Sequence, residues 1–99
     1  MKRTLVRYRT KPDKAQENQR LIENVFEELY AKAPEGLRYL ALRLGDGTFV
    51  HFISVEDGAP SVTTLDAFRM FQDGIKERCT EPLQAGEVTV VGNYRMLDA

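Results

Sequence analysis

The sequence predicts a single α+β domain with the element order β-α-β-β-α-β. An alternating segment at residues 3–10 precedes an amphipathic segment at 15–33, and two apolar runs flank a glycine-rich turn at 45–47. A second amphipathic segment at 63–79 is followed by another run of β-formers. Since a chain of 99 residues makes one core, we expect one domain over residues 1–99.

The first strand and the first helix have the clearest patterns. Residues 3–10 alternate with a period of two and are rich in β-formers, which is typical of a strand. Apolar side chains at 15–33 recur at spacings of three and four, which puts them on one side of a helix. Asp13 and Gln16 are spaced as an N-cap and its capping-box partner. Gly36 suits the left-handed turn that often follows a helix.

Two strands that form a hairpin are predicted at 37–44 and 48–55, joined by Gly45-Asp46-Gly47. Apolar residues lie on both faces of the second strand, with Ile53 on one face and Phe52 on the other. A strand with one solvent-facing side would alternate apolar with polar residues. We therefore expect both faces of the hairpin to be covered.

The second helix is predicted for 63–79, with Thr63 and Asp66 in capping positions. Gly74 lowers its stability slightly because glycine is a weak helix former. A long final strand is predicted from residue 87 to about residue 97, where valines and threonine are frequent.

This order of elements is the ferredoxin-like arrangement, in which both helices cover one face of a four-stranded antiparallel sheet. The other face would then expose Leu5 and part of the apolar set of the hairpin, a larger patch than monomers usually show. Packing against a second copy would cover it, and the long last strand would reach the edge of the partner. The pattern therefore predicts a homodimer.

Charge and hydropathy exclude several classes of partner. Lys and Arg number 14 against 15 Asp and Glu, so the chain lacks the basic excess that binds nucleic acid. Apolar stretches are far shorter than the roughly 20 residues of a membrane-spanning helix, and the N-terminus lacks a signal-peptide pattern. We expect a cytoplasmic protein that binds neither nucleic acid nor membrane.

Metal and cofactor motifs are missing from the sequence. Cys79 is the single cysteine, so it has no partner for an internal disulfide or a zinc site. Its place on the apolar stripe of the second helix favours a buried, unreactive thiol. Phosphate-binding loops, hydrolase elbows and metalloprotease motifs do not occur. The sequence therefore predicts no metal and no cofactor.

His51, the only histidine, and Tyr8 are the candidate catalytic residues. An imidazole titrates near neutrality, so a buried one beside a tyrosine can handle a proton. The alternative is a core histidine with both nitrogens hydrogen-bonded, and tyrosines that only fill the sheet.

The hairpin loop decides which residues meet His51. A two- or four-residue loop pairs it with Leu42, whereas a three-residue loop sets it near Tyr39, Ala41 and Arg43. Only the second register places polar side chains, those of Tyr39 and Arg43, near His51.

The motifs KPD before the first helix, EGLRY at the second strand and DGTFVHF in the hairpin resemble the dimeric α/β-barrel superfamily. The resemblance covers nearly the whole chain and is nearest to the group of antibiotic-biosynthesis-type monooxygenases. It implies a ligand pocket between helices and sheet, and in some members a cofactor-free oxygenation or the degradation of haem. Those enzymes carry an Asn on the first strand and a Trp and a His near the second helix. The matching strand positions here are Thr4, Val6 and Tyr8, Trp is absent, and 63–79 contains no His.

A predicted pocket between helices and sheet has mainly apolar walls, as pockets for small molecules usually do. Its predicted lining residues are Val6, Phe26, Tyr39, Arg43, Phe68, Phe71 and Ile75. The first hypothesis is a protein that binds a small apolar or aromatic molecule or acts as a cofactor-independent monooxygenase. The second is a non-catalytic dimeric module that acts through its assembly or a protein partner. A partly polar cavity beside His51 favours the first hypothesis, and a filled core favours the second.

Overall fold

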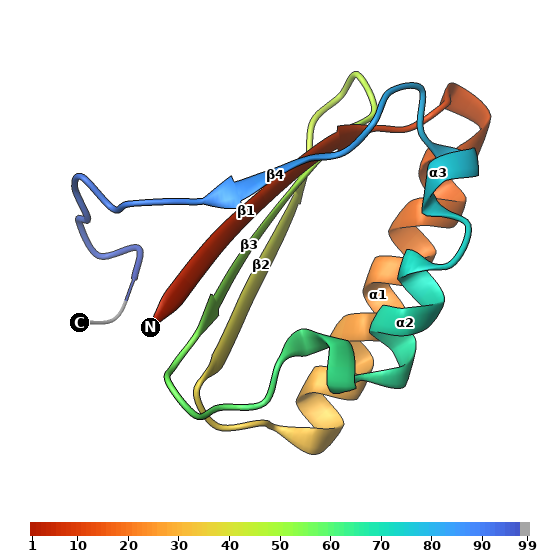
Figure 1. The fold of residues 1–99 in the computed structure, drawn as a ribbon. Helices are drawn as coiled ribbons and strands as arrows, with labels where there is room; N and C mark the ends of the chain where they lie inside the picture. Colours follow the sequence, from red (N-terminus) through yellow and green to blue (C-terminus); the bar gives the residue numbers. More distant parts are fainter. Residues whose placement is uncertain (98–99) are drawn as a thin grey trace.

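The computed structural model describes residues 1–97, so the last two residues of the predicted domain lie outside the described part. Its sheet has the strand order β2-β3-β1-β4, and all neighbouring strands are antiparallel. The helices lie on one face of this sheet (Figure 1). The elements are β1 (Lys2–Arg9), η1 (Pro12–Lys14), α1 (Ala15–Lys32), β2 (Leu37–Arg43), β3 (Thr48–Val55), η2 (Val62–Thr64), α2 (Asp66–Gln72), α3 (Ile75–Arg78) and β4 (Gln84–Glu87). The predicted ferredoxin-like fold is confirmed.

The hairpin between β2 and β3 has the three-residue loop Gly45-Asp46-Gly47. Arg43 pairs with Phe49, and the Leu44 N–H donates to the Thr48 carbonyl at 2.8 Å. Gly47 has a φ of 87°, and such a loop requires one residue with this left-handed conformation. His51 consequently pairs with Ala41. Of the two predicted registers, the structure has the one that places His51 on the same face as Tyr39.

The first helix has nearly the predicted limits, but its N-terminus is not capped as predicted. Asp13 lies inside η1, and no side chain caps the N-terminus of α1. The reason is that the chain enters α1 directly from this 3-10 turn, where the Lys14 N–H donates to the Lys11 carbonyl at 2.9 Å. At the other end Ala33 is left-handed, with a φ of 44° and its N–H on the Leu29 carbonyl, and Gly36 is left-handed as predicted, with a φ of 79°.

The predicted second helix is divided into η2, α2 and α3. Gly74 has a φ of 75° and separates the last two elements. Because a left-handed residue cannot continue a right-handed helix, this glycine turns the chain instead of merely weakening the helix.

The predicted caps Thr63 and Asp66 do not cap these helices. The Ser61 side chain accepts the Thr63 N–H at 3.3 Å. Glu28 of α1 accepts the N–H of Asp66 at 3.2 Å and of Ala67 at 2.7 Å. A carboxylate from another helix therefore satisfies the free amide groups of α2, which stabilises a helix N-terminus.

The predicted long final strand is wrong, because β4 covers only Gln84–Glu87. Thr4 faces Glu87 in the last pair of this ladder, although β1 itself continues to Lys2. The Val88 N–H still donates to the Arg3 carbonyl at 3.0 Å. The segment 88–97 then leaves the sheet (Figure 1), and the Val91 side chain is 99% exposed.

The two faces of the sheet differ in burial. The face under the helices holds the core, including Tyr8, Phe49, His51 and Ile53. The opposite face carries an apolar patch, which we call the outer patch. It consists of Leu5, Leu40, Leu42, Val50 and Phe52. Leu40 is 46% exposed and Leu42 is 51% exposed. As predicted, this face stays exposed because the helices cover only the other face of the sheet. No helix within residues 1–97 is long and apolar enough to cross a membrane.

Candidate functional site

His51 lies at the centre of the helix-covered face with both ring nitrogens hydrogen-bonded. Its side chain is only 2% exposed. The Tyr8 hydroxyl is 2.8 Å from Nε2, and the Tyr39 hydroxyl is 2.6 Å from Nδ1. Strands β1, β2 and β3 thus bring together one imidazole and two phenols.

Two further residues, which the sequence did not indicate as site residues, extend this cluster. Asn18 of α1 donates from Nδ2 to the Tyr8 hydroxyl at 2.9 Å. Arg78 of α3 donates from Nε to Asn18 Oδ1 at 3.0 Å. Asn18 is 0% exposed and Arg78 is 4% exposed. We call Arg78, Asn18, Tyr8, His51 and Tyr39 the buried chain.

The helical pattern contained a signal for Asn18 but none for Arg78. Asn18 lies four positions before Ile22 and seven before Val25, so the spacing puts it on the buried stripe of α1. Arg78 follows charged neighbours in a short helix, where an arginine usually faces solvent.

Burial keeps the aromatic members of the buried chain uncharged near neutral pH. It lowers the pKa of His51 to about 4, because a buried imidazolium loses its hydration. Burial likewise raises the pKa of the Tyr8 and Tyr39 hydroxyls well above the ordinary value. His51 is therefore a neutral hydrogen-bonding group at pH 7 and a weak base.

The space beside His51 is filled by aromatic rings. Its ring centroid lies 5.3 Å from that of Phe71, and Phe68 and Phe71 are 5.7 Å apart. Phe68 is 7% exposed and Phe71 4%, while Val6 and Ile75 are partly buried against the same core. These four residues of the predicted pocket thus belong to the packed core.

The other predicted lining residues border a surface groove between α1 and β2, which we call the α1/β2 groove. One hollow of about 440 Å³ is lined by Gln19, Ile22, Glu23, Phe26, Leu40, Ala41, Leu42, Arg43 and Phe49. A second hollow of about 280 Å³ is lined by Phe26, Leu29, Tyr30, Ala33, Pro34, Leu37 and Tyr39. Phe26 borders both hollows, so the groove runs from Arg43 past Phe26 to Tyr39.

Arg43 lies at one end of the α1/β2 groove, and within residues 1–97 it has no ion pair with a carboxylate. Its Nη1 donates to Gln19 Oε1 at 2.6 Å, and Gln19 in turn donates to Glu23 at 3.2 Å. The guanidinium carbon also lies 5.6 Å from the centroid of the Phe49 ring. The groove therefore combines apolar walls with a cation at one end and a phenol at the other.

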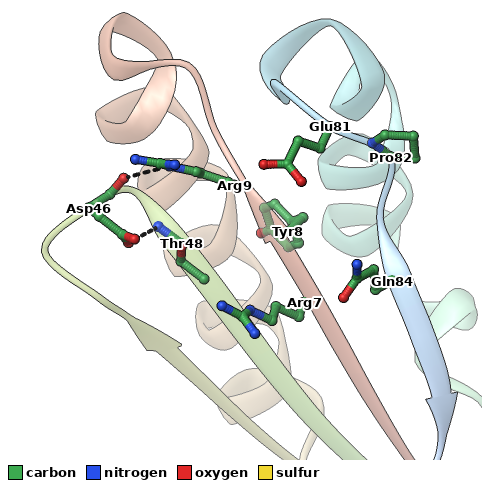
Figure 2. A pocket seen from close by; sticks show the side chains of 8 residues that line it. All are labelled: Arg7, Tyr8, Arg9, Asp46, Thr48, Glu81, Pro82 and Gln84. Atoms are coloured by element: carbon green, nitrogen blue, oxygen red, sulfur yellow. Dashed lines mark hydrogen bonds between the residues drawn. The ribbon is translucent and has the colours of Figure 1, made fainter.

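A separate polar hollow of about 240 Å³ lies where β1 passes between the hairpin loop and the chain before β4 (Figure 2). Arg9 donates from Nε to the Asp46 carbonyl at 3.2 Å, and the Asp46 carboxylate accepts the Thr48 N–H at 3.0 Å. The lining of the hollow includes two guanidiniums, of Arg7 and Arg9, and two carboxylates, of Asp46 and Glu81. The formal charges of this lining therefore balance.

The structure has no candidate metal site within residues 1–97. No group of three or more His, Cys, Asp or Glu side chains in this range could hold a metal ion. Cys79 is 8% exposed, as predicted, and burial raises the pKa of its thiol, which disfavours the reactive thiolate.

Comparison with known proteins finds likeness in structure only. No protein-family model and no curated protein matches the sequence. A Bacteroides thetaiotaomicron protein, provisionally named an antibiotic biosynthesis monooxygenase, matches with a TM-score of 0.76 and 14% identity, over 98% of this chain and 95% of that one. A Nitrosomonas europaea protein with the same provisional name matches with a TM-score of 0.72 and 16% identity, over 91% and 89%. A Mycobacterium tuberculosis protein matches with a TM-score of 0.71 and 15% identity, over 93% and 96%.

Identities this low establish the fold and leave the chemistry to the residues of each chain. The resemblance expected from the KPD, EGLRY and DGTFVHF motifs is confirmed at that level. This chain has the α+β ferredoxin-like fold shared by the antibiotic-biosynthesis-monooxygenase-type proteins.

Proposed function

We propose that this protein binds a small aromatic molecule with an anionic group in the α1/β2 groove, as a monooxygenase-like protein. The observation that carries the proposal is the groove itself, with Arg43 at one end and Tyr39 at the other. Apolar walls with a few polar groups are the usual composition of a small-molecule site. The provisional names of two structural neighbours, antibiotic biosynthesis monooxygenases, support the monooxygenase-like part of the proposal.

The distance between the two polar ends limits the size of the ligand. Tyr39 and Arg43 lie on one face of β2, four residues apart, which corresponds to about 13 Å along a strand. Fused aromatic rings fit such a length, with Phe26 along the middle. A carboxylate or phenolate at one end would replace Gln19 on the Arg43 guanidinium, because a charged acceptor forms the stronger hydrogen bond.

Binding of 2-naphthoate, measured by calorimetry, tests this proposal. We expect 2-naphthoate to bind more tightly than the less acidic 2-naphthol, and Arg43→Met to weaken the binding of 2-naphthoate about tenfold, since a charge-assisted hydrogen bond is lost. Arg20→Met removes an exposed arginine of α1 outside the groove and serves as the matched control. Equal affinities of the wild type and the Arg43→Met variant would contradict the proposal, as would no binding of either probe.

Oxygenation of the bound molecule is the enzymatic form of the proposal. Without a cofactor the substrate supplies all four electrons that reduce O₂: a ring CH₂ becomes C=O with one oxygen atom, and the other oxygen atom leaves as water with the two hydrogens of the CH₂ group. Tyr39 would contact the substrate, with His51 behind it. Oxygen consumption with anthrone as the probe separates an oxygenase, which Tyr39→Phe slows, from a protein that only binds.

A dimeric module without catalysis is the second candidate, and the filled space around His51 favours it. We propose in both cases that a second copy covers the outer patch. The segment 88–97 also leaves the sheet with exposed apolar side chains, including Tyr94 at 79% and Met96 at 81%. Packing between copies would remove this apolar surface from water.

Light scattering tests the assembly. We expect twice the chain mass of 11.3 kDa for the wild type, and a monomer when Leu40→Glu and Leu42→Glu place two charges in the outer patch. Tyr30→Glu, at a side chain of α1 that is 83% exposed, serves as the control and should leave the dimer intact. A monomeric wild type would exclude this assembly.

A further inference from the structure

We propose that Arg78 is a positioning residue that sets the direction of every hydrogen bond in the buried chain. It thereby determines the tautomer of His51 and leaves the Tyr39 hydroxyl hydrogen available to a ligand. This inference rests on the proposed function only where it concerns the ligand. Its first part concerns the free protein and is tested without any ligand.

The direction begins at Arg78, because a guanidinium has hydrogen-bond donors and no acceptor. Within residues 1–97 it has no ion pair with a carboxylate. Nε donates to Asn18 Oδ1 at 3.0 Å, and Nη1 donates to the Asp73 carbonyl at 3.0 Å. The Asn18 amide must therefore turn its oxygen to Arg78 and its NH₂ group to the other side.

The Asn18 NH₂ group then donates to the Tyr8 hydroxyl at 2.9 Å. Tyr8 is 3% exposed, so its own hydroxyl hydrogen needs an acceptor within the core. His51 Nε2, at 2.8 Å, is the remaining partner of this hydroxyl among the described residues. Tyr8 therefore donates to Nε2, which must be unprotonated.

A neutral imidazole carries one N–H, so the hydrogen of His51 lies on Nδ1. The low pKa of the buried ring, about 4, keeps it neutral at pH 7. Nδ1–H donates to the Tyr39 hydroxyl at 2.6 Å. Because Tyr39 accepts here, its own hydrogen is free to point to a ligand.

The opposite direction leaves the Tyr8 hydroxyl hydrogen buried without an acceptor. Protein cores avoid such unpaired groups. Tyr39 is only partly buried and borders the α1/β2 groove, where water or a ligand can accept its hydrogen. We therefore expect the Nδ1–H tautomer to exceed Nε2–H by about five to one or more.

For the ligand, this direction specifies a hydrogen-bond acceptor next to Tyr39. A carbonyl, carboxylate or phenolate oxygen would accept the free hydrogen. A ligand that meets Tyr39 with a CH group would gain no hydrogen bond there, and a ligand N–H would leave the hydroxyl hydrogen of Tyr39 unused.

Nitrogen NMR of the free protein at pH 7, with ¹⁵N-labelled histidine, tests the direction. His51 is the only histidine, so its two ring nitrogens are assigned without ambiguity. We expect Nδ1 to give the signal of a protonated nitrogen and Nε2 that of an unprotonated one. The reverse pattern in the wild type would overturn the proposal.

Asn18→Asp tests where the direction comes from. The introduced carboxylate accepts from Arg78 but cannot donate to Tyr8, so Tyr8 must donate to it and accept from Nε2–H. We expect the two nitrogen signals to exchange their protonation state. Asn24→Asp, at an exposed position of the same helix, should leave them unchanged.

An Asn18→Asp variant that folds and keeps the proton on Nδ1 would overturn the role of Arg78 and Asn18. If that variant does not fold, the wild-type pattern alone decides the direction. Neither spectrum involves a ligand, so a failure to bind 2-naphthoate would refute the proposed function and leave this test intact.

Discussion

We expect Phe71→Ala to lower the free energy of unfolding by about 3–5 kcal/mol, the cost of truncating a buried phenylalanine. Phe71 is 4% exposed, and its ring centroid lies 5.3 Å from His51 and 5.7 Å from Phe68. The Arg78 guanidinium carbon lies 5.5 Å from the same centroid. Alanine would remove apolar contacts on several sides and leave a cavity beneath the buried chain.

Denaturant unfolding of the variant and the wild type at one protein concentration measures this loss. Met70→Ala is the matched control, because the neighbouring side chain on α2 is 65% exposed and should change stability by at most about 0.5 kcal/mol. A domain of this size has about 5–15 kcal/mol in total, so Phe71→Ala removes a large share. Equal losses in the two variants would show that the face of α2 turned to the sheet is not the core.

A second large effect is the loss of stability between pH 6.5 and 4 through His51. The unfolded histidine has a pKa of about 6.5, whereas burial lowers the pKa in the folded protein to about 4. Above pH 6.5 both states are neutral and the contribution is fully present. As the pH falls toward 4, the unfolded chain binds a proton that the folded chain does not, so stability falls by about 3 kcal/mol.

Unfolding free energies measured across this pH range, for the wild type and for His51→Gln, isolate that contribution. The variant has no histidine, so its remaining pH dependence comes from the carboxyl groups, which both proteins share. We expect the curve of the variant to be flatter by about 3 kcal/mol over the range. Parallel curves would mean that the imidazole is accessible to protons in the folded state.

Local pattern was enough to predict most of the secondary structure. The periods of two and of three to four residues report which face of an element is buried, and this information lies within each segment. Helix α1 and strands β1 to β3 therefore begin and end within a residue or two of their predicted limits. The Gly-Asp-Gly loop also limited His51 to a small choice of partners, one of which was Ala41.

Features that depend on distant segments could not be predicted in this way. The cap of α2 comes from Glu28, which is 38 and 39 residues away from the amide groups it accepts. Strand β4 ends at Glu87, although β1 continues to Lys2 and the residues after Glu87 are good β-formers.

The same distinction, between local pattern and contacts of distant segments, applies to the candidate site. The sequence by itself predicted that Tyr8 and Phe71 face the space between helices and sheet, because alternation and helical spacing assign a face to each side chain, whereas it left two registers open for His51. Only the tertiary structure decided that rings fill the space beside His51, that Phe26 and Arg43 line a groove at the edge, and that Arg78 reaches Asn18 across 60 residues. A pattern shows that a side chain is covered, whereas its partner depends on how α1 and α3 pack against the sheet.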